Sequence, residues 1–64
     1  MQFSVEQQIV EVERELKLRK STYSRLVKNG KMKPETARKQ YELMKDVLET
    51  LIIYRDYFSG KMVN

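Results

Sequence analysis

The sequence contains no cysteine and no histidine among its 64 residues. Without cysteine the chain can form neither a disulfide nor a thiolate-bound zinc site. Histidine is the commonest metal ligand and the usual general base near neutral pH, so its absence argues against a metal centre and against catalysis. Chains this short usually gain stability from a disulfide, a metal or a second subunit. We therefore expect no cofactor, and a homodimer as the additional source of stability.

Long apolar runs and a signal peptide are missing as well. The longest apolar run covers residues 51–54, whereas a membrane span needs about 18 apolar residues. The N-terminus lacks the basic-then-apolar pattern of a signal peptide. The sequence therefore predicts a soluble, cytoplasmic protein with no membrane contact. Hydrophobic residues make up 41% of the chain, which is enough to form a core.

Glycine and proline are scarce, and their positions predict a turn. Gly30, one of two glycines, can adopt the left-handed conformation that ends a helix. Pro34, the only proline, has the backbone angle of a first helical position. Lys28 and Glu35 flank this segment and suit the charges of the two helix ends. Because only about three or four residues separate the helices, they must fold back as an antiparallel hairpin.

The predicted fold class is all-α, with one helical-hairpin domain over residues 1–64. The first helix is expected at about residues 4–29, the turn at about 30–33 and the second helix at about 34–59. Ser4 and Gln7 have the spacing of a capping box at the start of the first helix. Gly60 is expected to cap the second helix, and residues 60–64 are expected to form a flexible tail.

Both predicted helices carry a heptad-like seam, with a position facing the other helix every three or four residues. Besides the paired layers below, the seam includes Ile9, Arg19, Met44 and Arg55. Folding at the turn pairs positions whose numbers sum to 63 or 64, so one register satisfies every layer. The layers are Leu26–Ala37, Tyr23–Tyr41, Leu16–Leu48, Val12–Leu51 and Val5–Phe58.

The two arginines on the seam, Arg19 and Arg55, have two interpretations. In the first, their aliphatic stems cover the seam while their charged heads reach water or a carboxylate. Glu15, four residues before Arg19, is a suitable partner. In the second, the arginines fix the register or the pairing at some loss of stability.

The second helix carries more apolar side chains than one seam can bury, and the first helix is expected to offer a second stripe of Val10, Leu18 and Val27. Ordinary exposure is one explanation, since much of any protein surface is apolar. The preferred one is a four-helix bundle of two hairpins, with the second helices at its centre. The predicted dimer interface consists of Leu43, Val47, Leu51, Ile52, Ile53, Tyr54, Tyr57 and Phe58.

The net charge of +4 is unevenly distributed. Residues 17–39 hold nine basic residues against Glu35 alone, a net +8, whereas residues 1–16 carry −3 and residues 40–64 carry −1. A concentrated positive end attracts polyanions. The candidate binding residues are Lys20, Arg25, Lys28, Lys31, Lys33, Arg38 and Lys39.

Three interpretations of this basic end stay open: solvation of the turn, non-specific nucleic-acid contact, and docking onto an acidic patch of a protein. Tyr23 and Tyr41 could stack on bases, but their seam positions favour core packing. No known nucleic-acid-binding motif is present. Catalysis is not expected, because Ser21, Ser24 and Ser59 have no histidine to activate them. The carboxylates of Glu11 and Glu15 are expected on solvated helix faces.

The segment from Glu15 to Met32 resembles a family of small phage and prophage proteins. Their common pattern is Glu, an aliphatic residue and Arg, then Tyr-Pro-Arg-Trp-Val and Gly-Lys/Arg-Met, with Ala and an apolar-Met pair in the second helix. The similarity spans roughly residues 11–52, with Ser24 in place of the usual Pro and Leu26 in place of Trp. The matching residues are Glu15, Leu18, Arg19, Tyr23, Arg25, Val27, Gly30, Met32, Ala37 and Met44.

The resemblance implies a phage or prophage origin, the bacterial host cytoplasm and an accessory role, without an assigned activity. The expected function is a non-enzymatic, dimeric helical module that binds a phage or host protein. The alternatives are a nucleic-acid-binding accessory protein that uses the basic turn end, and an inert structural part of a larger phage assembly.

Overall fold

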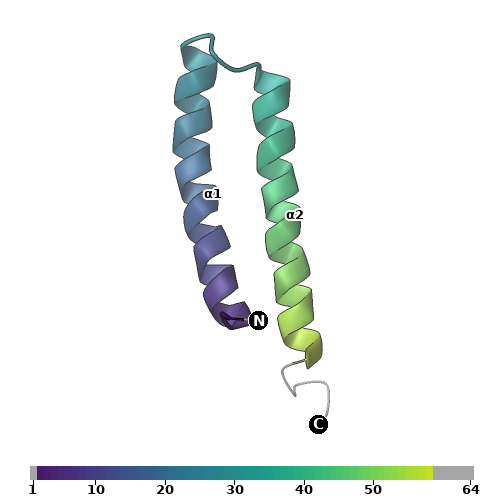
Figure 1. Cartoon of the computed structure of the whole chain (residues 1–64). Helices are drawn as coiled ribbons and strands as arrows, with labels where there is room; N and C mark the ends of the chain where they lie inside the picture. Colours follow the sequence, from purple (N-terminus) through teal and green to yellow (C-terminus); the bar gives the residue numbers. More distant parts are fainter. Residues whose placement is uncertain (1, 59–64) are drawn as a thin grey trace.

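The computed structural model describes residues 2–58, which form two helices and no strand. Helix α1 spans Val5–Lys28 and helix α2 spans Pro34–Phe58. The helices lie side by side in opposite directions and form an elongated hairpin (Figure 1). The predicted all-α hairpin is therefore confirmed. The expected cap at Gly60 and the expected tail at 60–64 lie outside the described residues.

Local contacts explain where α1 begins. The Oγ of Ser4 accepts a hydrogen bond from the backbone N–H of Gln7 at 3.1 Å, and the Ser4 N–H donates to Oε1 of Gln7 at 3.0 Å. This is the predicted capping box, which satisfies donors that the first helical turn leaves unpaired. The helix itself starts one residue later than expected because Ser4 is the cap.

The turn is closed by the backbone of the last residues of α1. Gly30 has φ 72°, in the left-handed region. The N–H of Lys31 donates to the carbonyl of Leu26 at 2.8 Å, and the N–H of Gly30 donates to that of Val27 at 3.1 Å. This pair of bonds is the Schellman motif, which satisfies carbonyls at the end of a helix. Pro34 then opens α2, as predicted.

The seam positions lie between the helices, with one exception. Ile9, Leu16 and Ala37 are buried, and the other predicted seam residues are half-buried apart from Phe58. The side chain of Phe58 is 66% exposed. Its ring centroid lies 4.6 Å from that of Tyr54 and 4.8 Å from that of Tyr57. The predicted burial of Phe58 against Val5 is therefore wrong, because Val5 is the first residue of α1 and no further turn of that helix flanks the ring.

Two observations agree with the predicted register. The hydroxyl of Tyr23 donates to Oε1 of Gln40 at 3.2 Å, which places Tyr23 beside the turn of α2 that holds Tyr41. Val12 and Leu51 line the same groove. Within the described residues, neither helix contains a stretch long and apolar enough to cross a bilayer.

The seam arginines follow the first of their two interpretations. Their side chains are 31% and 33% exposed, so the stems are partly covered by the hairpin. The guanidinium of Arg19 pairs with Glu15, the predicted partner. Nε of Arg55 lies 3.2 Å from Oδ1 of Asp56, a contact that helical spacing did not suggest because adjacent residues point in different directions.

Candidate interaction surfaces

The predicted dimer interface divides into an exposed part and a partly covered part. Leu51 and Ile52 are half-buried, and Leu51 lies on the seam with α1. The structure therefore does not bring all eight residues onto one surface. The exposed fractions of the other six range from 43% to 66%, and these six are Leu43, Val47, Ile53, Tyr54, Tyr57 and Phe58.

Four of these exposed residues fall on one side of α2 with helical spacing. They repeat at intervals of four, three, four and three residues once Thr50, which is also exposed, is included. Residues so spaced share a helix face. Sequence reasoning omitted Thr50 because it is polar, although the spacing alone could have identified it. We call this set the outer stripe; it consists of Leu43, Val47, Thr50, Tyr54 and Tyr57.

The outer stripe continues into a groove between the helices. This open-end groove has a volume of about 640 Å³ and is lined by Phe3, Gln7, Gln8, Glu11, Val12, Val47 and Leu51. Val47 belongs to both the groove and the outer stripe. Phe3, which is 58% exposed, was not expected at this surface. The open half of the hairpin thus presents one continuous apolar surface on and beside α2.

The outer face of α1 does not offer a matching stripe. Val10 and Leu18 are 64% and 50% exposed, but eight positions separate them and charged side chains lie between them. Val27, the third residue expected there, is half-buried between the helices. The prediction of a second apolar stripe on α1 is therefore wrong, because Val27 points to the seam side of its helix.

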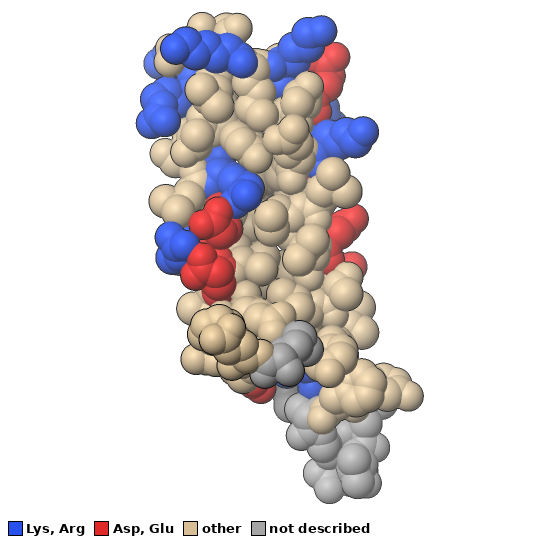
Figure 2. All heavy atoms as spheres, in the orientation of Figure 1, with Lys and Arg blue, Asp and Glu red and all other residues tan. Residues whose placement is uncertain are grey.

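The turn end is basic in space as well as in sequence. Figure 2 shows lysine and arginine side chains gathered around the turn, while most of the acidic side chains in view lie farther down the same face, near its middle. All seven predicted binding residues are exposed, and within residues 2–58 none of them forms an ion pair. Their charges therefore remain available to an anionic partner.

A second groove lies between the helices at this end. This turn-end groove has a volume of about 600 Å³ and combines apolar side chains with three cations. Such a lining suits a ligand that carries an anionic group next to an apolar one. Arg25, Lys31, Lys33 and Lys39 lie outside it. The lining residues are Lys20, Tyr23, Ser24, Val27, Lys28, Pro34, Ala37, Arg38 and Tyr41.

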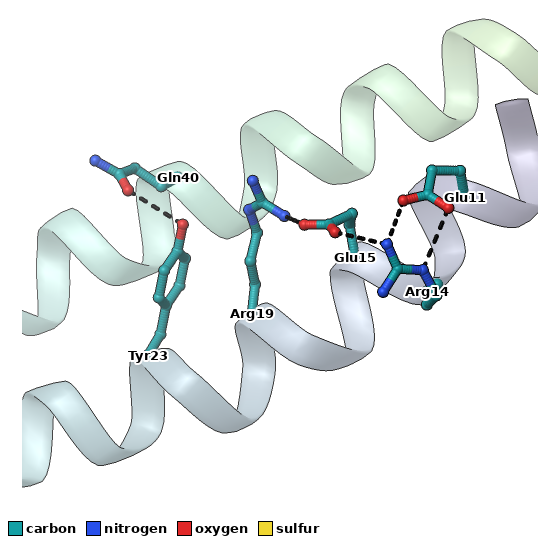
Figure 3. A network of polar contacts seen from close by, with 6 residues as sticks. All are labelled: Glu11, Arg14, Glu15, Arg19, Tyr23 and Gln40. Carbon is teal, nitrogen blue, oxygen red and sulfur yellow. Dashed lines mark hydrogen bonds and ion pairs between the residues drawn. The ribbon is translucent and has the colours of Figure 1, made fainter.

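A ladder of ion pairs runs along α1 between the two ends (Figure 3). Nη2 of Arg14 lies 3.1 Å from Oε2 of Glu15, and the same guanidinium pairs with Glu11. The hydrogen bond from Arg14 lowers the pKa of the Glu11 carboxyl, and the hydrogen bond to Glu15 raises the pKa of the Arg19 guanidinium. The carboxylate of Glu11 is thus stabilised in its charged form by Arg14.

Glu15 departs from expectation in its burial. Its side chain is 34% exposed, so it is half-covered rather than fully solvated, because it lies between Arg14 and the seam residue Arg19. Among the described residues, no group of three or more acidic side chains is placed to hold a metal ion.

Comparison with known proteins gave no match to any protein-family model, curated protein or solved structure. The resemblance to small phage and prophage proteins therefore stays a prediction.

Proposed function

We propose that this chain is a homodimeric protein-interaction module in which the α2 helices of two hairpins form the centre of a four-helix bundle. The exposure of the outer stripe supports this proposal most directly. Its large apolar side chains lie in one row on one helix, whereas the exposed apolar residues of α1 are isolated.

The energetics of burial support association. The hairpin has one seam, and only three described residues in it are buried. Burying a large apolar side chain contributes roughly 1.5 to 3 kcal/mol. A second copy that covered the outer stripe would thus contribute an amount comparable to the whole stability of a small domain.

The extent of the surface also fits a dimer. The six exposed apolar residues of α2 keep 43% to 66% of their area accessible. Covering them on two copies removes on the order of 1,000 Å², which is the lower limit of a specific interface. The open-end groove beside Val47 adds further apolar area to the same surface.

The proposed role is non-enzymatic. The glutamates of the ladder are engaged by arginines. The described linings of the two grooves consist of apolar, hydroxyl, amide and basic groups with a single carboxylate, Glu11. We place the protein in the bacterial cytoplasm as a phage or prophage accessory protein that binds a phage or host protein. This placement rests on the resemblance described above.

A matched pair of substitutions tests the dimer. Leu43 of the outer stripe and Leu18 on α1 are the same residue type and are 56% and 50% exposed. Leu43→Asp should dissociate the dimer because it places a charge in the proposed apolar contact, whereas Leu18→Asp should leave the dimer intact. Sedimentation velocity at tens of micromolar distinguishes these results. The same sedimentation coefficient for both variants would contradict the proposal.

A second candidate function is polyanion binding at the turn end, and the seven exposed, unpaired cations favour it. Nucleic-acid binding of this kind should weaken steeply with salt, because each neutralised phosphate releases counterions. Arg38→Gln should weaken binding to a labelled duplex and reduce its salt dependence. Lys45→Gln, which removes an exposed charge from the same helix outside the basic end, is the control. No binding of a duplex or a single strand at low salt would eliminate this candidate.

A further inference from the structure

We infer that the two copies of α2 pack antiparallel about Thr50, which makes a rod with one basic turn end at each pole. This inference rests on the dimer proposed above and adds the orientation of the second copy. It starts from the outer stripe, which extends seven residues to each side of Thr50, so that a reversed copy brings its members together in pairs whose numbers sum to 100 or 101. Reversing the stripe about Thr50 brings Leu43 opposite the partner's Tyr57 and Val47 opposite the partner's Tyr54.

The sizes of the side chains favour this reversal. In the antiparallel arrangement each aliphatic residue of the stripe meets an aromatic one, so all four apolar layers have a similar thickness. A parallel arrangement would place Tyr54 and Tyr57 against their own copies and Val47 against its own copy. Layers of unequal thickness pack poorly between straight helices, because facing positions need large and small side chains to interdigitate.

The charges favour the same arrangement independently. A parallel dimer would set two basic ends, each with a net charge of +8 over residues 17–39, side by side. Packed helices lie about 8 to 10 Å apart, which is no more than about one Debye length at physiological ionic strength. In the antiparallel dimer, Pro34 lies sixteen residues from the centre. The two turns are then about 50 Å apart at 1.5 Å per residue, and their repulsion is screened.

The antiparallel contact leaves the basic ends uncovered. It is made by the outer stripe, which extends seven residues on either side of Thr50, from Leu43 to Tyr57. The turn-end groove, lined in part by Lys20, Lys28 and Arg38, lies beyond this overlap. The assembly therefore carries two separate polyanion-binding ends that face opposite directions.

Distance measurement between spin labels tests the orientation. The chain has no cysteine, so Thr36→Cys provides a single label site on exposed α2 surface outside the apolar contact. Thr36 lies fourteen residues before Thr50. The antiparallel dimer predicts a label separation of about 40 Å from the helical rise, and a parallel dimer predicts about 10 Å from the helix separation. A dimer with the short distance would overturn the inference.

Cross-linking gives a second and independent readout. Leu43→Cys and Tyr57→Cys should each cross-link poorly alone, and should form a disulfide-linked dimer when the two variants are mixed and allowed to exchange. A parallel dimer reverses this result, with self-linking of each variant and none between them. The mass of the Thr36→Cys sample is measured alongside. A monomer there contradicts the proposed dimer itself, whereas a dimer with the wrong distance contradicts only its orientation.

Discussion

The two halves of the hairpin differ in the kind of side chain that they expose to water. At the turn half, the backbone bonds that close the helix are made within the chain, and the exposed side chains are mainly charged. At the open half, Glu11, Arg14 and Glu15 of α1 form ion pairs, while α2 exposes a row of large apolar residues. The turn half is closed by local contacts, whereas the open half exposes an apolar surface that we propose a second copy covers.

The largest expected effect tests the seam that both halves share. Leu16 is 7% exposed and Leu18, two residues away, is 50% exposed. Leu16→Ala should lower the free energy of unfolding by about 2 to 5 kcal/mol because it removes packed core contacts. Leu18→Ala should change it by about 0.5 kcal/mol or less, as for a typical surface site. Urea unfolding of both variants at one protein concentration measures the difference. Similar losses would contradict the assignment of the seam.

The next largest effect is expected from a substitution in the turn, at Gly30. Gly30 has φ 72°, and a Cβ added there would meet no atom within 4 Å. Gly30→Ala should therefore act through the backbone alone and lower the stability by about 1 to 2 kcal/mol, the cost of a left-handed L-residue. Gly30→Asn should cost less, since asparagine tolerates this conformation better. Thermal unfolding should show this order of the two variants, and the reverse order would contradict the role given to the turn.

A comparable effect is expected at the opposite end of α1. Ser4→Ala removes the acceptor for the N–H of Gln7 and should lower the stability by about 1 kcal/mol. Ser21→Ala removes an exposed hydroxyl from the interior of the same helix and should not destabilise it, because alanine has the higher helix propensity. Circular dichroism melts compare the two. A loss from Ser21→Ala as large as that from Ser4→Ala would argue against the capping role.

The smallest effect concerns pH and belongs to the open half. The hydrogen bond from Arg14 holds the pKa of Glu11 below its usual value of 4.5. A pKa lower in the folded than in the unfolded chain contributes stability at neutral pH, and this contribution is lost as the pH falls through the folded pKa. The melting temperature should fall slightly more between about pH 5 and pH 3 for the wild type than for Glu11→Gln. If the melting temperatures of the two proteins depend identically on pH, the ion pair of Glu11 and Arg14 makes no measurable contribution to stability.

The features that sequence reasoning predicted well are those set by neighbours along the chain. The capping box at Ser4, the left-handed Gly30 and the start of α2 at Pro34 depend on residues only a few positions apart. The seam also followed from periodicity, because the short turn leaves the helices a single way to pack.

The misplaced residues depend on what lies across the hairpin or beyond its ends. The exposure of Phe58 depends on where the helices stop covering each other. The partial burial of Val27 depends on the exact direction of its side chain. Phe3 lines the open-end groove although it precedes α1, so the helical periodicity did not include it. The periodicity of one chain also cannot predict which of its surfaces a second molecule would cover.

The mass of the wild-type chain in solution tests the central claim most directly. One chain has a mass of 7.7 kDa. Sedimentation equilibrium at tens of micromolar should give a mass near 15 kDa, twice that of one chain, together with a helical circular dichroism spectrum. A helical, cooperatively folded species of 7.7 kDa at that concentration would show that the exposed face of α2 needs no second copy, and would contradict the account.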